Sequence, residues 1–372
     1  MRQLLGTNKV LAYLTMMAPR LLELYRVLKK DGVLFLHCDP TASHYLKLLL
    51  DAVFGYKNFK NEIIWCYRQG GRGNKYFPKK HDTIFFYTKG ESYTFNADSI
   101  RIPYHGTGGY QTSGKGVTNK NGKTYKPNEK GKIPEDWWDI PALAPMSKER
   151  VGYPTQKPLA LLDRIIKVGS NEGDLVLDPF CGCGSAIVSA QNNNRKWIGI
   201  DVTHIAITTI KERLNNNFNL LNDYTVHGEP IDIEGAIELS QNNRFQFQIW
   251  ALSLIGINYA DDYNSIKKGP DGGVDGVRYF EKGNGVLSKA IIQVKSGKVG
   301  VKDIREFNAV IEKENAAIGV FITLKTPTKN MVSEAAGAGT FNHVDGKIYP
   351  KISIVTIEDL LKHSHLHNAI FP

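Results

Sequence analysis

The sequence predicts an α/β fold, in which a doubly wound parallel sheet is followed by a second, smaller α/β domain. Three observations predict this class. Apolar runs of strand length alternate with runs of helical period across 33–214. A turn with two glycines joins one of these strands to a helix at 178–185. A further series of helix, strands, helix and strand begins near residue 244, after Asn-rich stretches at 215–223 and 240–243.

The elements of the first part follow from periodicity and from turn signals. Apolar residues at spacings of three and four predict a long helix, with a kink at Pro19 or a division into two helices there as open alternatives. Thr41 or Ser43 is the expected N-cap of the next helix. The predicted elements are, in order, helix 11–29, strand 33–37, helix 41–53, strand 62–67 and strand 83–88.

The elements of the second part are predicted in the same way. Pro158 begins a helix, because proline lacks the N–H that a first helical position leaves unbonded anyway. Then come, in order, strand 175–177, helix 185–191, strand 197–200, helix 206–214, helix 244–255, strand 290–295, helix 303–314, strand 317–324 and strand 352–357. Strands that alternate with helices favour parallel pairing.

The composition limits the class of protein. The chain has 372 residues, enough for two or three domains, and 42% of them are hydrophobic, which excludes a globally disordered chain. Its four cysteines are too few for a disulfide framework. The sequence contains no Cys-x-x-Cys pair, so a structural zinc site is not expected. No apolar run reaches the roughly 18 residues of a membrane span. We therefore expect a cytoplasmic protein.

The net charge of +10 is concentrated in one part of the chain. Residues 67–135 hold 13 basic and 5 acidic residues, a net charge of +8, together with eleven aromatic residues. Basic side chains suit phosphates, and interleaved aromatic rings suit stacking on bases. A region of about 67–150 is therefore predicted to bind double-stranded DNA. The alternative is a solvated surface loop, which the Gly-, Asn-, Lys- and Thr-rich stretch 106–132 would also suit.

A glycine-containing turn follows the predicted strand 175–177. It reads Asp178-Pro179-Phe180-Cys181-Gly182-Cys183-Gly184. The two glycines let the backbone approach a ligand closely, and the start of the next helix offers unbonded amides. Ile187 stands where a dinucleotide site would have a third glycine. Asp201 ends the next strand, 17 residues beyond Gly184, where its carboxylate suits the two hydroxyls of a ribose.

Together with Tyr153-Pro154-Thr155-Gln156-Lys157-Pro158, about 20 residues upstream, this turn resembles that of the DNA amino-methyltransferases, in the permuted group whose cofactor loop follows the recognition region. The resemblance covers roughly 5–235. It implies a Rossmann-like, S-adenosylmethionine-dependent methyltransferase domain over 1–235, with an inserted target-recognition region at about 67–150 and a cofactor-binding half at 151–235. The cofactor is then S-adenosylmethionine.

The resemblance also implies roles for single residues. It places Asp201 at the ribose and Thr155 and Lys157 near the methionine carboxylate. The methionine part would be surrounded by Asp178, Phe180, Gly182 and Gly184. For Lys157 the alternative is a solvated side chain at a helix start. For Cys181 and Cys183 packing is the expected role.

The catalytic motif of this group has no counterpart in the sequence. Members carry Asp-Pro-Pro-Tyr or Asp-Pro-Pro-Phe before the helix that corresponds to 11–29, and this motif orients the amino group of a flipped base. Ten residues precede that helix here, and none of them matches. Cys38-Asp39-Pro40-Thr41 follows a later strand and lacks the second proline and the aromatic residue. We therefore expect an N-terminally shortened form of a longer enzyme.

A second motif lies in the C-terminal part. Asp275 precedes a predicted strand, and Gln293 and Lys295 share one face of the strand Ala290–Lys295, because side chains alternate along a strand. Nuclease chemistry needs oxygen ligands for a divalent cation beside a phosphate, and a positive charge that steadies the attacking water. These three residues offer that set, with Asp275 as the candidate metal ligand.

The second motif resembles the PD-(D/E)xK restriction-endonuclease fold, in the Mrr-like branch where glutamine replaces the second acid. The resemblance covers about 244–360 and implies an Mrr-like nuclease-type domain over 236–372, possible use of magnesium, and DNA as partner. Gln246 and Gln248 stand in the first helix where an acid often lies. The alternative is a β-hairpin with a polar face, in a domain that serves DNA binding or assembly.

These patterns predict a site-specific DNA methyltransferase of a restriction-modification system. It would transfer methyl from S-adenosylmethionine to the exocyclic amine of adenine or cytosine, and it would carry an endonuclease-like domain. Two alternatives stay open: a DNA-binding remnant without catalysis, and a nuclease that is active only through its C-terminal domain.

Overall fold

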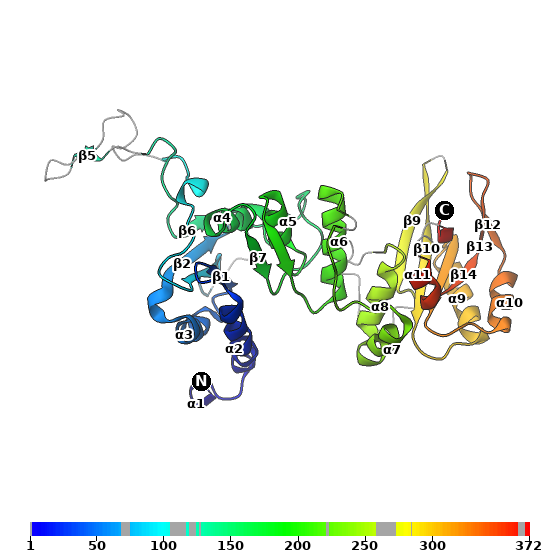
Figure 1. Cartoon of the computed structure of the whole chain (residues 1–372). Helices are drawn as coiled ribbons and strands as arrows, with labels where there is room; N and C mark the ends of the chain where they lie inside the picture. Colours follow the sequence, from blue (N-terminus) through cyan, green and yellow to red (C-terminus); the bar gives the residue numbers. More distant parts are fainter. Residues whose placement is uncertain are drawn as a thin grey trace. The chain divides into compact units, whose positions relative to one another are not determined.

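The computed structural model describes residues 2–67, 75–104, 117–118, 124–125, 128–220, 223–257, 273–283, 285–363 and 369–372 (Figure 1). Its contacts divide the chain into two compact units. Unit 1 comprises Met1–Arg150, Gln156–Cys181 and Ser185–Ile200, and unit 2 comprises Val151–Thr155, Gly182–Gly184 and Asp201–Pro372. The predicted boundary between 1–235 and 236–372 stays a prediction.

The larger sheet of unit 1 has the strand order β1-β3-β2-β6. Its strands are β1 (Val33–Cys38), β2 (Phe59–Cys66), β3 (His81–Thr88) and β6 (Trp137–Asp139). β3 pairs antiparallel with both β1 and β2, and only β2 and β6 are parallel. The expectation of parallel pairing is therefore wrong here. The reason is that the described part of the connection from β2 to β3 contains no helix, and a parallel return needs a long crossover.

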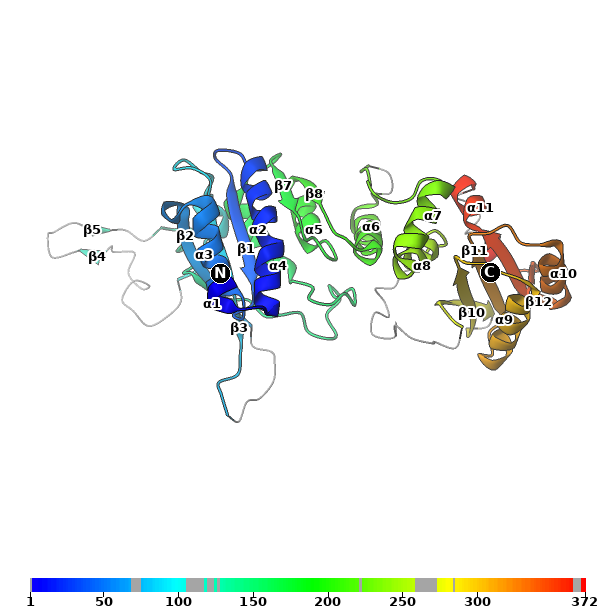
Figure 2. The same cartoon turned by 90° about the horizontal axis from the view of Figure 1, so that it is seen from below.

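Helices cover both faces of this sheet (Figure 2). α2 (Lys9–Val27) and α3 (Ser43–Phe54) pack on one face through Leu14, Leu21, Leu46 and Leu50, among others. α4 (Leu159–Gly169) contributes Leu161 to the other face. α2 is one helix that contains Pro19, so the proline does not divide it into two.

The N-cap prediction for α3 is wrong. The residue before the helix is Ala42, which forms no side-chain cap. Asp39 Oδ1 accepts hydrogen bonds from the amides of Thr41 and Ala42, at 3.1 and 3.3 Å, and so closes the turn before the helix. Thr41 lies in this turn and Ser43 is already the first helical residue, so neither stands at the N-cap position.

The second sheet of unit 1 has two strands, β7 (Leu175–Asp178) and β8 (Lys196–Gly199). They are parallel and are connected by α5 (Ser185–Asn192), so the predicted strand–helix–strand unit is confirmed. Six consecutive residues of α5, from Ser185 to Ala190, are buried. In unit 2 the chain continues with α6 (His204–Phe218), α7 (Ile233–Asn242) and α8 (Arg244–Ser253).

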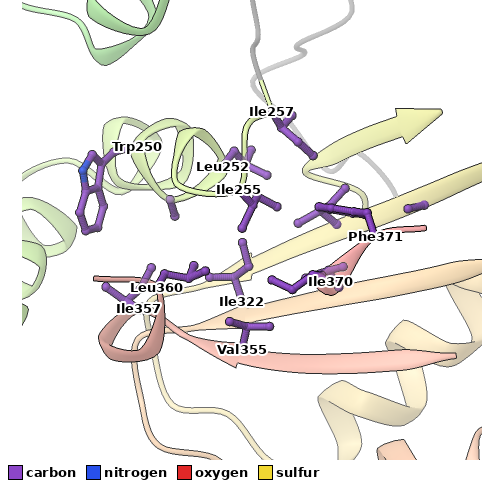
Figure 3. Close-up of a cluster of buried hydrophobic side chains, with 14 of the residues drawn as sticks. Trp250, Leu252, Ile255, Ile257, Ile322, Val355, Ile357, Leu360, Ile370 and Phe371 are labelled. Atoms are coloured by element: carbon purple, nitrogen blue, oxygen red, sulfur yellow. The ribbon is translucent and has the colours of Figure 1, made fainter. Parts of the chain in front are cut away.

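Unit 2 is built on a four-stranded sheet with the order β14-β11-β10-β9. Its strands are β9 (Gly276–Gly283), β10 (Val286–Lys295), β11 (Ile318–Thr323) and β14 (Ile352–Thr356). α8 and α11 (Ile357–Lys362) pack on one face, in a cluster that includes Trp250, Ile322 and Phe371 (Figure 3). α9 (Val301–Lys313) and α10 (Lys329–Gly337) cover the other face.

Several short elements complete the structure. They are α1 (Arg2–Leu5), the 3-10 helices η1 (Tyr56–Asn58) and η2 (Ala97–Ile100), the strand pair β4 (Val117–Thr118) with β5 (Thr124–Tyr125), and the strand pair β12 (Thr340–Asn342) with β13 (Ile348–Pro350). Within the described ranges, none of the helices has the length and apolarity that crossing a membrane requires.

Candidate functional site

The turn after β7 is held by backbone hydrogen bonds within unit 1. The amide of Ile200 donates to the carbonyl of Asp178 at 2.9 Å, and the amide of Cys181 donates to the carbonyl of Ile200 at 3.0 Å. The amide of Phe180 donates to the Asp178 carboxylate at 3.1 Å. This bonding fixes the turn at the carboxyl end of β7 and leaves Phe180 48% exposed.

Asp201 and the glycines of the turn meet in unit 2. The amide of Gly182 donates to Asp201 Oδ2 at 3.0 Å. The amide and the hydroxyl of Thr203 donate to Asp201 Oδ1 at 2.9 and 2.8 Å. A carboxylate accepts about four hydrogen bonds, so these three fix its orientation and leave acceptor capacity for a ligand. The structure thus brings together Gly182 and Asp201, which the sequence places 19 residues apart.

The two glycines of the turn have different surroundings. Both have left-handed backbones, with φ of +47° at Gly182 and +74° at Gly184. A Cβ atom on Gly184 would lie 2.6 Å from Cγ1 of Ile210 on α6, too close unless Ile210 or the turn moves. A Cβ on Gly182 would lie 3.3 Å from the ring of Tyr153. Glycine at 184 is therefore required by packing against α6, a reason that the sequence did not indicate.

Thr155 and Lys157 belong to different units. Thr155 has a φ of +62°, a left-handed conformation that costs a residue other than glycine about 1–3 kcal/mol. Such strain is common at ligand sites. Lys157 lies near Asp82 in unit 1, since its positive charge lowers the pKa of that carboxyl group. Lys157 is partly buried, and its proposed place near the methionine carboxylate stays a prediction.

A polar network at Asp82 was not predicted from the sequence. His37 Nε2 lies 2.9 Å from Asp82 Oδ2, and the hydroxyl of Tyr67 donates to Asp82 Oδ1 at 3.2 Å. Burial opposes ionisation of Asp82, but the hydrogen bond and charge of His37, with Tyr67 and Lys157, hold the pKa of this carboxyl below its ordinary value. Asp82 therefore stays ionised and orients the two rings.

This network and the turn lie at corresponding ends of their strands. A Cβ on Gly169, at the end of α4, would lie 2.9 Å from Val33, so the end of α4 packs on the start of β1. β7 follows α4 after a short connection. His37 lies near the carboxyl end of β1, and Asp178 lies at the carboxyl end of β7.

The C-terminal motif is assembled at the start of β9 and on the neighbouring strand β10. The amide of Asp275 donates to the carbonyl of Ile292 at 2.8 Å, and the amide of Val294 donates to Asp275 Oδ2 at 2.6 Å. Gln293 is 7% exposed, and its side-chain amide donates to the carbonyl of Gly273 at 2.9 Å. Lys295 lies two residues further along β10, on the same face as Gln293.

Among the described residues, few side chains around this motif could act as metal ligands. In the parts of the chain that the structure describes, no group of three or more His, Cys, Asp or Glu side chains could hold a metal ion. Gln246, on the first helix, accepts a hydrogen bond from the amide of His204 at 2.8 Å and so bonds to the start of α6. The segment 268–272 before Asp275 lies outside the described residues.

The basic region is described only in part. Most of 106–132 lies outside the described residues. Among the described residues, Tyr76 is 71% and Phe77 is 95% exposed, and both lie close in sequence to Lys75 and Lys79, which are exposed as well. Exposed rings between lysines fit stacking and phosphate contacts in nucleic-acid binding.

The chain is similar to known DNA methyltransferases. Residues 2–212 match the DNA methylase family, and residues 241–360 match a restriction endonuclease family. The type II methyltransferase M.HpaI of Haemophilus parainfluenzae is 35% identical over 198 residues, which are 53% of this chain and 58% of that protein. The type II methyltransferase M1.MboII of Moraxella bovis is 35% identical over 184 residues, 47% of this chain and 69% of that protein.

A likeness to solved structures exists as well. The M1.HpyAVI–SAM complex is 21% identical and has a TM-score of 0.38, with 54% of this chain and 83% of that chain covered. The chain spans about six tenths of the length of M.HpaI. Because the family match covers more than half of the chain, and M1.MboII is covered over more than two thirds of its length, the chain belongs to the DNA methylase family, and it carries a restriction-endonuclease-like domain behind the methylase part.

Proposed function

We propose that the protein transfers a methyl group from S-adenosylmethionine to the exocyclic amine of adenine or cytosine in double-stranded DNA. Membership of the DNA methylase family supports the reaction class. The observation that carries the proposal is the Asp201 carboxylate, which Gly182 and Thr203 hold in place through three hydrogen bonds while acceptor capacity remains for a ribose hydroxyl. A restriction-modification role in the cytoplasm completes the proposal.

The residues present fit this cofactor. Asp201 supplies an acceptor for the ribose, and the exposed ring of Phe180 supplies an apolar surface. Asp178, Gly182 and Gly184 would lie along the methionine part, while Thr155 and Lys157 would lie near its carboxylate. When bound, S-adenosylmethionine supplies a methyl group on a sulfonium centre. The chain would bind and orient this donor, and the basic region of about 67–150 would position the DNA through phosphate contacts.

Calorimetric titration of the whole chain with S-adenosylhomocysteine tests the cofactor assignment. Asp201→Ala removes the charged acceptor, and hydrogen bonds to charged groups contribute about 1.5–3 kcal/mol each, so the affinity is expected to fall at least tenfold. Asp174→Ala is the control, because the Asp174 side chain accepts a hydrogen bond from the amide of Asn171 in the turn before β7. Unchanged affinity in Asp201→Ala would contradict the proposal. A tritiated-methyl transfer assay then separates catalysis from DNA binding alone.

A second candidate function is DNA cleavage by the C-terminal domain. The match to a restriction endonuclease family favours it, as does the position of Asp275 just before β9, beside Gln293 and Lys295 on β10. Carboxylate and carboxamide oxygens are ligands that Mg²⁺ accepts, and Mg²⁺ usually keeps several waters, so Asp275 and Gln293 fit a magnesium ion as partial ligands. Lys295 would then stabilise developing negative charge.

Plasmid cleavage in the presence of magnesium tests this second function. The whole chain is compared with Asp275→Ala and with Asp345→Ala, which changes an exposed acid between β12 and β13. Cleavage that disappears only in Asp275→Ala would support the nuclease assignment. Equal cleavage in all three proteins would contradict it. Asp275→Asn keeps the hydrogen-bond acceptor for the Val294 amide and separates loss of charge from loss of structure.

A further inference from the structure

Arg213 is a buried cation that neither the sequence motifs nor the proposed function uses. It lies on α6 and is only 6% exposed. Its guanidinium Nη1 donates to the carbonyl of Cys183 at 2.7 Å and lies 3.5 Å from the sulfur of the same residue. Burial of a charge is costly unless it forms strong hydrogen bonds. The contact with the turn is therefore a substantial part of what holds Arg213 inside the protein.

The contact fixes the orientation of one peptide plane. All described peptide bonds are trans, so the carbonyl of Cys183 and the amide of Gly184 point in opposite directions. Because Arg213 holds this carbonyl toward α6, the N–H of Gly184 points away from α6. Among the described contacts the Gly184 amide has no hydrogen-bond acceptor, whereas the amide of Gly182 donates to Asp201.

α6 holds Gly184 by a second contact as well. Ile210 and Arg213 are three residues apart and so lie on the same face of the helix. Ile210 packs directly against Gly184, where a side chain at 184 would collide with it. The helix thus sets both the position of Gly184 and the direction of its N–H.

We propose that Arg213 is a positioning residue for the methyl donor. It holds the Cys183–Gly184 peptide so that the amide of Gly184 donates to the carboxylate of the amino-acid part. This inference rests on the proposed function, since it names the residue that prepares one part of the same site. It assigns Arg213 an effect on the amino-acid end of the ligand and none on the adenosine end.

Two ligands distinguish this role from general support of the fold. S-Adenosylhomocysteine carries the amino-acid carboxylate, and methylthioadenosine has the same thioether nucleoside without it. In Arg213→Met, which keeps an unbranched side chain without charge, the affinity of the whole chain for S-adenosylhomocysteine is expected to fall about tenfold. The affinity for methylthioadenosine should change less than about twofold. Arg213→Lys keeps one charged donor and should restore part of the lost affinity.

Arg195→Met is the matched control. Arg195 is also partly buried and also donates to backbone carbonyls, those of Ser170 and Asn193, but outside the turn. It should leave both affinities unchanged. The inference is overturned, while the proposed function stands, if Arg213→Met loses affinity equally for both ligands. It is also overturned if Arg213→Lys restores none of the lost affinity. If the unaltered chain binds neither ligand, the proposed cofactor site fails, and the inference fails with it.

Discussion

The substitution Gly184→Ala tests the packing of the turn against α6. Alanine adds one methyl group at a position with a φ of +74°, where its Cβ would lie 2.6 Å from Cγ1 and 3.3 Å from Cδ1 of Ile210. A left-handed backbone costs alanine about 1–2 kcal/mol. Overpacking at a buried contact costs about 1–3 kcal/mol more. The free energy of unfolding should therefore fall by about 2–5 kcal/mol.

Gly228→Ala provides the matched control for the backbone contribution. Gly228 lies in the same unit with a φ of +86°, and a Cβ there would have no atom within 4 Å. Its substitution should cost only the conformational part, about 1–2 kcal/mol. Unfolding by guanidinium chloride, followed by circular dichroism, measures both variants. The difference between them isolates the collision with Ile210.

A double-mutant cycle identifies the colliding residue. Ile210→Ala removes the two atoms that alanine at 184 would meet, so in this background Gly184→Ala should cost no more than Gly228→Ala. If Gly184→Ala and Gly228→Ala destabilise the protein equally, within about 0.5 kcal/mol, the packing argument is refuted. The packing argument is also refuted if Gly184→Ala lowers the free energy of unfolding as much in the Ile210→Ala background as in the unaltered protein. In either case the turn would not rest on α6 as described.

Two further predictions concern unit 1. The pKa of Asp82 is lowered in the folded protein, so its ionised form contributes stability at pH values above its ordinary pKa, and this contribution disappears as the pH falls through the lowered value. The Asp82→Asn variant should therefore be less stable than the unaltered protein at neutral pH. In thermal unfolding, the difference in stability between the two proteins should shrink below about pH 4, and a difference that stays constant with pH would contradict the argument. DNA affinity should fall steeply with salt, and replacing Lys75 and Lys79 by glutamine should reduce the slope of log K against log salt by up to about 1.8 in fluorescence anisotropy titrations. An unchanged slope would remove these two lysines from the DNA-binding surface.

Strand and helix positions were largely predictable, because each depends on a local pattern. The apolar stripe of α2, the strand–helix–strand unit from β7 to β8 and the strands β11 and β14 lie close to where the sequence places them. Strand direction was not predictable in the same way. β1 and β3 are formed by residues 33–38 and 81–88, which are distant in sequence, and their antiparallel pairing depends on how the chain folds between them. The sequence pattern of each segment is equally compatible with parallel pairing.

The residues of the candidate site also differ in whether a local sequence pattern predicts them. Gly182, Gly184 and Asp201 are visible in the sequence, because a turn after a strand and an acid after the next strand have fixed spacings. His37 and Asp82 are 45 residues apart, and their contact follows only from the register in which His37 lies opposite Ile84. Arg213 likewise reads as one more polar residue of an amphipathic helix. Its contact with Cys183 appears only when α6 is packed.

The structure assigns different tasks to neighbouring amides of the turn. The amide of Gly182 is bonded within the protein, to the carboxylate of Asp201, and so it orients the group that would receive the ribose. The amide of Gly184 is held pointing away from α6 by the bond between Arg213 and the preceding carbonyl. Two glycines alone would leave this turn free to adopt many conformations, since glycine has the widest backbone freedom. An acid on one side and a buried arginine on the other reduce that freedom before any ligand arrives, which lowers the entropic cost of binding.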